Sequence, residues 1–321
     1  DVKTIKSIIR EAGIVGLGGA TFPTHVKVAP PSDKRIDTLI INGCECEPYL
    51  TCDHRLMVEH SERIIYGTRA LLKALGINKA VIGIELNKPD AIAAMEKAAA
   101  DYAGIEVIPL KIKYPQGAEK QLITALTGKE VPSGGLPMDI GIVVNNVGTA
   151  AAVQAAIQWG MPLIERVVTV SGEGITEPQN FLVRIGTRLS EVVDAAGGFR
   201  GTPKQVIMGG PLTGMAQFDL SVPVTKCTSG LLVFNYLRTA RQPEPCIRCG
   251  RCVDVCPAFL LPVTIVRYAD AGKLDSAVEW GLLDCIECGS CSYVCPANRF
   301  LVQSIKLAKQ EVQAQRSKKT S

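Results

Sequence analysis

The sequence predicts an α/β unit with an open, mostly parallel sheet, a small β-grasp module of the α+β class, and a helical, ferredoxin-like unit. Three observations support this division. Strand and helix periods alternate over about the first 150 residues, two strands and a helix with a returning strand follow, and eight cysteines lie in two short runs near the carboxyl end. We expect the three domains to cover residues 1–160, 161–240 and 241–321.

The composition is that of a globular protein. A chain of 321 residues is long enough for two or three domains, and 47% hydrophobic with 21% charged residues excludes a disordered or fibrous chain. No run of about 18 apolar residues predicts a transmembrane helix, and the start lacks the pattern of a signal peptide. Because the chain begins at Asp1 and not at Met, we expect a fragment or processed product that lacks an N-terminal segment.

The excess of positive charge, 35 − 31 = 4, lies in the C-terminal tail. Such a tail is usually a solvated, frayed end, and contact with an anionic membrane surface or an acidic carrier is the alternative. No other feature supports nucleic-acid binding. From position 300 onward the tail has one acidic residue, Glu311. Its basic residues are Lys306, Lys309, Arg316, Lys318 and Lys319.

The chain opens with a predicted helix over residues 1–12 that carries Ile5, Ile8 and Ile9 on one face. It leads into the glycine-rich segment 13–27, GIVGLGGATFPTHVK. Glycines allow positive φ and let backbone N–H groups converge on a phosphate or a flat ring. A plain glycine-rich connection is the alternative, and the Rossmann fingerprint is excluded because the loop follows a helix.

Strands and helices then alternate. Polar residues end the first and last strands, in GCECEPY (43–49) and NNVGT (145–149). Ligands bind α/β sheets just beyond the carboxyl ends of the strands, so we expect a ligand site at this edge. The predicted strands cover 37–42, 79–86, 105–112 and 140–145, and the predicted helices cover 54–75, 90–102, a segment opening at 114–121, and 150–159.

The β-grasp module and the last unit follow. The module is predicted from a hairpin of strands 166–171 and 181–185, a helix over 188–196 and a strand over 204–208. Its glycine-rich turns, such as 209–214, are interpreted as structural. Residues 243–245 are expected to form a linker. The helices predicted beyond it cover 263–271, 274–283 and 301–315.

The two cysteine runs, CIRCGRCVDVCP and CIECGSCSYVCP, are an internal duplication, since each cysteine of the second lies 285 − 246 = 39 residues after its counterpart. Three cysteines spaced two residues apart wrap one face of an iron–sulfur cubane, and the fourth, before Pro, ligates the other cluster. We therefore predict two [4Fe-4S] clusters. The predicted ligands are Cys246, Cys249, Cys252 and Cys295 for cluster 1, and Cys285, Cys288, Cys291 and Cys256 for cluster 2.

Other uses of these cysteines fit less well. A zinc ribbon needs two C-x-x-C pairs, and disulfides within such short runs would be strained. Two clusters indicate a protein that moves single electrons in a reducing compartment, the cytoplasm. If a nicotinamide is the electron source or sink, a flavin is the usual converter between hydride and single electrons. The glycine-rich loop, the corner 42–48 and the turn 145–149 are the three segments that could bind it.

These segments resemble the FMN-bearing, NADH-oxidising subunit of respiratory complex I. GLGGATFPTHVK (16–27) is similar to its G-R-G-G-A-G-F-P-T-G-x-K signature. NGCECEP (42–48), YPQGAE (114–119) and NNVGT (145–149) resemble N-x-D-E-x-E-P, Y-x-x-G-E-E and N-N-V-E-T. A β-grasp domain of the SLBB type follows in both. The two cysteine runs differ from complex I, and nearly the whole chain is similar to the C subunits of Rnf-type ion-translocating ferredoxin:NAD oxidoreductases, which normally have a further N-terminal domain.

The resemblance implies FMN as cofactor and NAD(H) as substrate, with no catalytic residue of the protein in the hydride transfer. A solvated loop is the alternative for the acids of the 42–48 corner. By matched position, the implied cofactor-binding residues are Gly16, Gly18 and Gly19 along FMN and the dinucleotide, Asn42, Glu45 and Glu47 at the flavin or the nicotinamide amide and ribose, Phe22 stacked on a ring of NADH, Lys27 at its phosphates, Glu119 at the adenosine end, and Asn145, Asn146 and Thr149 at the phosphate and ribityl groups of FMN.

Five positions depart from the complex I signatures and leave fewer charged partners for the nucleotide: Leu17, Thr21, Cys44, Ala118 and Gly148. The remaining thiols are interpreted as inert, with a metal site that includes His54 as the alternative for the first three, and His25 and His60 as ordinary polar positions. These thiols are Cys44, Cys46, Cys52 and Cys227.

The implied function is that of a peripheral subunit on the cytoplasmic face of a membrane complex. It would exchange hydride between NAD(H) and FMN and relay single electrons through the clusters to partner subunits that transport ions. A cobalamin reductase of a bacterial microcompartment, which resembles the same family, and a non-catalytic electron wire or docking subunit are the alternatives. The sequence determines neither the direction of electron flow nor the coupling ion.

Overall fold

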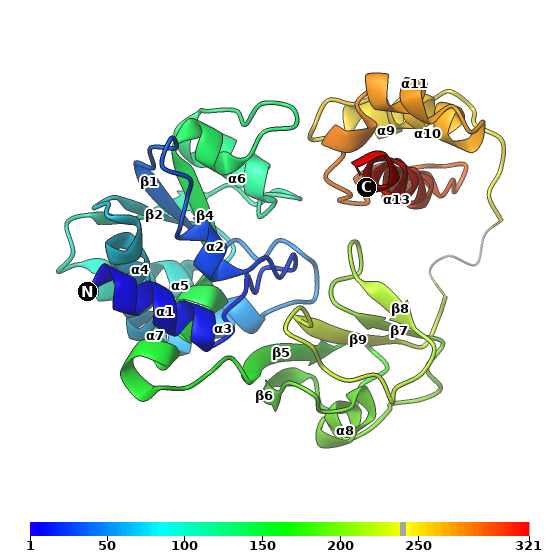
Figure 1. Cartoon of the computed structure of the whole chain (residues 1–321). Coiled ribbons are helices and arrows are strands. Elements are labelled where there is room, and N and C mark those ends of the chain that lie inside the picture. Colours follow the sequence, from blue (N-terminus) through cyan, green and yellow to red (C-terminus); the bar gives the residue numbers. More distant parts are fainter. Residues whose placement is uncertain (238–241, 321) are drawn as a thin grey trace. The chain divides into compact units, whose positions relative to one another are not determined.

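The computed structural model describes residues 1–237 and 242–320. They fall into two units, Asp1–Tyr236 and Leu237–Ser321 (Figure 1). The first unit contains two sheets, and the second is helical. Within the described residues, no helix is both long and apolar enough to cross a membrane.

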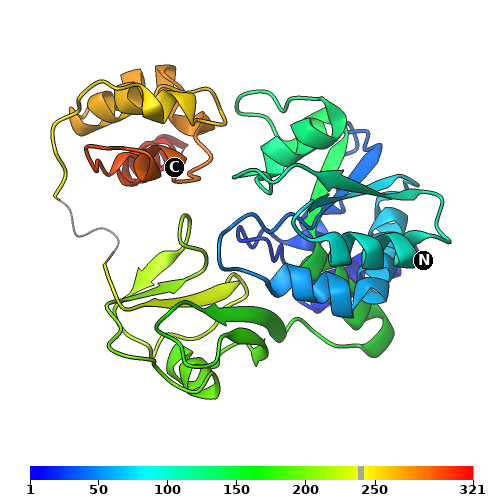
Figure 2. The same ribbon diagram turned by 180° about the vertical axis from the view of Figure 1, so that it is seen from behind.

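The first sheet has the strand order β3-β2-β1-β4, and all its neighbours are parallel. Its strands read as continuous apolar runs because both faces of the sheet are covered. Leu39 and Ile41 enter the core that α1, α3, α4, α5 and α7 build, whereas Ile40 enters the core beneath α6 (Figures 1 and 2). The strands are β1 (Thr38–Asn42), β2 (Ala80–Glu85), β3 (Ile105–Leu110) and β4 (Ile142–Asn146).

The helices of this part differ from the prediction in three places. The single helix predicted over 54–75 is wrong: two helices meet at His60, whose φ of −136° breaks the helical path without a Gly or Pro to signal it. The helix expected to open at 114 begins only at Glu119, and the one expected from 150 begins at Val147, because the Asn146 side chain caps it. The helices are α1 (Val2–Glu11), α2 (Thr24–Lys27), α3 (Cys52–Glu59), α4 (Ser61–Leu75), α5 (Pro89–Ala99), α6 (Glu119–Thr127), the 3-10 turn η1 (Pro137–Ile140) and α7 (Val147–Trp159).

The second sheet has the order β6-β5-β9-β7-β8, in which only β5 and β9 are parallel. The predicted hairpin is present, with Arg166 opposite Val183, and α8 packs on the sheet over an aliphatic core. The β-grasp interpretation is therefore confirmed. Its elements are β5 (Glu165–Ser171), β6 (Gln179–Arg184), α8 (Leu189–Ala195), β7 (Gln205–Met208), β8 (Met215–Gln217) and β9 (Gly230–Phe234).

The second unit consists of short helices around the cysteine runs and one long C-terminal helix. Residues 242–250 have no regular structure, and the helix predicted over 274–283 ends at Glu279 before a 3-10 turn. Ile265, Leu282, Leu301 and Ile305 form part of its core. The elements are α9 (Arg251–Asp254), α10 (Pro262–Asp270), α11 (Leu274–Glu279), η2 (Leu282–Asp284), α12 (Ser290–Tyr293) and α13 (Leu301–Thr320).

The close approach of α4 to α7 generates a prediction. A Cβ atom on residue 67 would lie 1.8 Å from the carbonyl oxygen of Ala150, so Gly67 is required by packing. In an unobstructed helix, Gly→Ala stabilises by up to about 1 kcal/mol. We expect Gly67→Ala to destabilise the chain by roughly 2 kcal/mol or more, measured by urea unfolding. Lys73→Ala, at an exposed position of α4, is the control, and equal stability of Gly67→Ala and the wild type would contradict the packing argument.

Candidate functional site

Three segments far apart in the sequence meet at the carboxyl edge of the parallel sheet. The register of β1 and β4 sets Asn42 beside Asn146. The glycine-rich loop reaches the same place, because the Leu17 N–H donates to Thr149 Oγ1 at 2.9 Å across 132 residues. A Cβ on Gly18 would touch the Asn146 side chain at 3.4 Å. The structure therefore brings together the loop, the 42–48 corner and the 145–149 turn.

The glycine-rich loop is a short hairpin with an exposed tip. The Gly16 N–H donates to the Phe22 carbonyl at 2.9 Å, and Gly19 and Thr21 have φ of +120° and +50°. Phe22 is 46% exposed, so its ring is free to stack on a planar ligand. Leu17, which stands where the resemblance has an Arg, is 7% exposed and packs into the core.

The two asparagines that end β4 are in different states. Asn146 donates through Nδ2 to Asp53 Oδ2 at 2.6 Å and accepts from the Gly148 N–H at 2.8 Å. Asn145 is 3% exposed, and within the described residues neither its Nδ2 nor its Oδ1 has a hydrogen-bond partner. Burying an unpaired amide costs about 1–3 kcal/mol, so a ligand that pairs with it would recover this cost.

The 114–119 segment belongs to the same site. Asn42 Nδ2 donates to the Gly117 carbonyl at 2.8 Å, and Asn42 Oδ1 accepts from the Cys44 N–H at 3.1 Å. The Gly117 N–H points at Cys46 Sγ, 3.4 Å away. A side chain at Gly117 would be in tight contact with this corner, since its Cβ would lie 3.3 Å from that sulfur.

Two of the residues assigned to the dinucleotide pair with each other. Lys27 Nζ lies 3.0 Å from Glu119 Oε1 and donates to the Val144 carbonyl at 2.9 Å. The side chains are 24% and 42% exposed, so the ion pair contributes little to stability.

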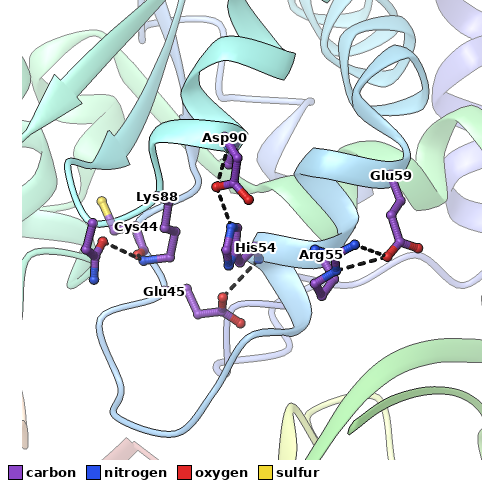
Figure 3. Close-up of polar contacts among 9 residues, drawn as sticks. Cys44, Glu45, His54, Arg55, Glu59, Lys88 and Asp90 are labelled. Atoms are coloured by element: carbon purple, nitrogen blue, oxygen red, sulfur yellow. Dashed lines mark hydrogen bonds and ion pairs between the residues drawn. The ribbon is translucent and has the colours of Figure 1, made fainter.

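Glu45 is part of the structure of the corner and does not lie in a solvated loop. Its φ is +46°, and its two carboxylate oxygens accept the N–H groups of Asp53 and His54 at 2.8 and 2.9 Å, at the start of α3 (Figure 3). Ligand atoms of Glu45, Cys52 and Asp53 lie within 4.8 Å of one another. Burial, followed by the charge of Asp53, raises the pKa of Glu45 from 4.5 to about 7. Burial also raises the pKa of Asp53, against the hydrogen bond from Asn146.

A buried ion pair supports the same corner. Lys88 Nζ donates to the Cys44 carbonyl at 2.7 Å and lies 3.6 Å from Glu85 Oε2, with side-chain exposures of 6% and 2% (Figure 3). The hydrogen bond from Lys88 to the Cys44 carbonyl holds the peptide group that precedes Glu45. The positive φ of Glu45 needs such support. Sequence reasoning missed Lys88, and its spacing of three residues from Glu85 was the only available signal.

Glu47 is held by the second sheet. Its carboxylate accepts from the Leu212 N–H at 3.1 Å and from the Thr213 hydroxyl, both in the 209–214 turn. A Cβ on Gly210 would lie 2.3 Å from Glu47 Oε2, so this glycine permits the contact. The turn that was interpreted as purely structural therefore positions a predicted site residue.

Of the thiols near the site, Cys44 and Cys52 are buried and Cys46 is partly buried. Burial raises the pKa of Cys44 and Cys52 well above the usual range and that of Cys46 to about 11. The His54 ring lies 2.7 Å from Asp90 Oδ1 of α5 (Figure 3), and among the described residues the ligand atoms that gather with Cys52 are those of Glu45 and Asp53, not His54. This arrangement favours inert thiols over a metal site that includes His54.

In the second unit, the four cysteines predicted for cluster 2 line one cavity with apolar walls from α10 and α13. All twelve cysteines of the chain are free thiols, so none of the eight predicted iron ligands is held in a disulfide. Burial raises the pKa of Cys252, and the neighbouring charges of Cys246 and Cys295 raise it further, so three of the ligands predicted for cluster 1 are also close together. The cavity-lining cysteines are Cys256, Cys285, Cys288 and Cys291.

The duplication extends to the backbone. In each run, the residue two positions after the first cysteine donates its N–H to that sulfur at 3.4 Å. Residues 39 positions apart share the left-handed conformation, which turns successive sulfurs inward. The matched pairs and their φ values are Arg248 and Glu287 at 56° and 57°, Gly250 and Gly289 at 79° and 79°, and Phe259 and Asn298 at 53° and 51°.

Comparison with known proteins identifies the family of this chain. Models described as the Nuo51 FMN-binding domain, the SLBB domain and the 4Fe-4S dicluster domain match residues 9–155, 167–216 and 238–296. The C subunit of the Na(+)-translocating ferredoxin:NAD(+) oxidoreductase complex of Acetobacterium woodii is 50% identical over 320 residues, which are 99% of this chain and 72% of that protein. The C subunit of the proton-translocating complex of Clostridium ljungdahlii is 52% identical over 317 residues, 98% of this chain and 69% of that protein.

The chain belongs to the family of C subunits of ion-translocating ferredoxin:NAD(+) oxidoreductase complexes. In the air-oxidised NAD+-reducing [NiFe]-hydrogenase, one chain has a TM-score of 0.70 over 95% of this chain and 63% of its own length. Its sequence identity of 23% makes that likeness one of fold alone. The predicted family and fold class are confirmed.

The cofactors of this family member are FMN and two [4Fe-4S] clusters, as the sequence predicted. The residues present fit them. The Asn145 amide, which has no hydrogen-bond partner in the described part of the chain, and the exposed glycine tip suit a flavin, and the cavity lined by four thiols suits a cubane. The zinc-ribbon and disulfide interpretations are therefore excluded.

The carboxyl group of Glu45 generates a prediction about pH. Because its pKa is higher in the folded chain, about 7 against the ordinary 4.5, the protonated form favours folding. This stabilisation is present below the ordinary pKa and is lost as the pH rises through 7. We expect flavin-free wild type to lose roughly 1–3 kcal/mol more stability than Glu45→Gln between pH 5 and 8, measured by urea unfolding. Glu59→Gln, an exposed position of α3, should keep the wild-type slope, and an unchanged slope in Glu45→Gln would contradict the prediction.

Proposed function

We propose that this chain exchanges hydride between NAD(H) and FMN and relays single electrons through two [4Fe-4S] clusters, as a peripheral subunit on the cytoplasmic face of a membrane complex. Partner subunits would exchange electrons with ferredoxin and couple the reaction to ion transport. The observation that carries the proposal is the convergence of the glycine-rich loop, the 42–48 corner and the 145–149 turn in a chain that also has the dicluster domain. The names of the relatives support it.

FMN would lie against the exposed glycine tip and the ends of β1 and β4. Gly16, Gly18 and Gly19 have no side chains that would block the FMN. Asn145 would offer both its Nδ2 and its Oδ1 to the ligand. The amino end of α7 favours a phosphate through its dipole. Asn42, Asn146 and Thr149 hold these segments together, so they position the site through the bonds that they already make.

When bound, the flavin supplies the exchange between a two-electron hydride and single electrons. The chain's own residues bind and orient the dinucleotide. The exposed ring of Phe22 would stack on it, and Lys27 would leave Glu119 to meet its phosphates. Glu45 and Glu47, each fixed by hydrogen bonds, would present their remaining lone pairs to the nicotinamide amide and ribose.

The ligand sets of the clusters and the domain boundaries are proposed as the sequence predicted them. Cys246, Cys249, Cys252 and Cys295 would hold cluster 1, and the cavity shared by the other four ligands supports cluster 2. The start of the second sheet at Glu165 and the change to helical structure beyond 242 support domains of 1–160, 161–240 and 241–321.

Anaerobic reconstitution tests the function. Iron, sulfide and flavin are quantified in the reconstituted chain, which is then titrated with NADH while the flavin absorbance is followed. Bleaching of the flavin band, followed by reduction of the clusters, is the expected result. Iron and sulfide with no bleaching would favour a non-catalytic electron wire, and reduction of an added corrinoid would favour a cobalamin reductase.

Asn145 generates a further prediction. Because its buried amide has no hydrogen-bond partner among the described residues, Asn145→Ala should lower FMN affinity by roughly 10–100-fold without lowering the stability of the flavin-free chain. Fluorescence titration of flavin-free protein with FMN measures the affinity, and urea unfolding measures the stability. Asn78→Ala, an exposed residue before β2, is the matched control. Wild-type affinity in Asn145→Ala would remove this residue from the flavin site.

A further inference from the structure

The duplicated cysteine loops place the same coordination geometry in two different surroundings. Their backbones match in the left-handed residues and in the N–H···S bonds, so coordination alone does not distinguish the two clusters. The burial of their ligands does. Cys246 and Cys249 of the first run are exposed, whereas Cys285 and Cys288 are partly covered and Cys291 is 8% exposed.

The surroundings of cluster 2 are apolar. Its cavity is walled by Ile265 of α10 and by Val302 and Ile305 of α13, all of them buried. Each electron that a cluster accepts adds a negative charge, and a low-dielectric wall disfavours that charge more than water does. Burial therefore lowers the reduction potential of cluster 2 relative to that of cluster 1.

The charges at the two loops also differ. At matched positions, the first loop has the exposed Arg248 and the second has Glu287. A positive charge favours the reduced cluster, and a negative charge disfavours it. At this position too, the sequence makes cluster 2 the harder of the two to reduce.

In the second repeat, a lysine counteracts the effect of Glu287 on the reduction potential, and the matched position of the first repeat has no lysine. Lys309 of α13 lies 2.9 Å from the Cys285 carbonyl and 2.6 Å from Glu287 Oε1, with side-chain exposures of 16% and 35% for the pair. The residue at 309 − 39 = 270 is Asp270, which instead pairs with Arg299 at 3.6 Å. The ammonium of Lys309 thus neutralises Glu287 directly beside a ligand of cluster 2.

We propose that the Lys309–Glu287 ion pair sets the reduction potential of cluster 2, which lies below that of cluster 1, so that an electron added to the two clusters resides mostly on cluster 1. Lys309 and Glu287 act on cluster 2 through their charges, and neither is assigned to substrate binding. The inference rests on the ligand sets of the proposed function. It does not require that the chain bind NAD(H).

Redox titration of the reconstituted chain, reduced with dithionite and followed by the electron paramagnetic resonance signals of the clusters, tests the proposal. Cys249→Ala removes a ligand of cluster 1 and identifies the signal of cluster 2. Lys309→Met leaves Glu287 unpaired and should lower the cluster 2 midpoint, with about a tenfold change in the oxidised-to-reduced ratio, or about 59 mV for one electron. Glu287→Gln leaves Lys309 unpaired and should raise the same midpoint.

Lys306→Met, on the same helix, is the matched control and should leave both midpoints unchanged. A wild-type cluster 2 that titrates above cluster 1 would overturn the proposal. So would shifts of Lys309→Met and Glu287→Gln in the same direction, or a shift in Lys306→Met as large as that in Lys309→Met. If Lys309→Met fails to assemble its clusters, the sign of the shift in Glu287→Gln decides. Since dithionite replaces NADH, a chain that fails to oxidise NADH still gives these potentials, and the two proposals can fail separately.

Discussion

The parallel pairing of β1 with β4 is the constraint on which the proposed flavin site depends. It sets Asn42 beside Asn146 and Ile41 beside Asn145, and it is secured because both faces of the sheet are buried. A shift of one residue would turn the apolar side chains of either strand toward the wrong core. The cost of such a shift fixes which polar side chains stand at the carboxyl edge, and the glycine-rich loop then closes over them through Thr149.

This edge carries features that weaken the fold. Among the described residues Asn145 is buried without a hydrogen-bond partner, Glu45 and Thr21 have positive φ, and the carboxyl groups of the half-buried Glu45 and Asp53 lie close together. Such features cost of order 1–3 kcal/mol each and are retained where a ligand uses them. The aliphatic core beneath the edge, the Lys88–Glu85 pair and the 209–214 turn supply the rigidity that holds them.

The iron–sulfur unit depends on a different constraint, the local path of the backbone around the cysteines. Its duplicated loops reproduce one backbone path twice, so the geometry of coordination is local and repeats with the sequence. What does not repeat is the covering: α13 passes over the second loop and brings Lys309 to it. Local geometry thus defines the sites, and the packing of a distant helix makes them unequal.

The sequence by itself determined the presence of two iron–sulfur clusters, the segments proposed for the flavin site and the strand–helix alternation. These depend on cysteine spacing, glycine backbone freedom and hydrophobic period, all of which act within a few residues. The tertiary structure decided the break at His60, the late start of α6 at Glu119, the pairing of Lys27 with Glu119 and the support from Lys88. The break at His60 has no Gly or Pro to signal it in the sequence. The two lysine contacts join groups that meet only after the sheet has formed, and the sequence pattern does not show which residues become such partners.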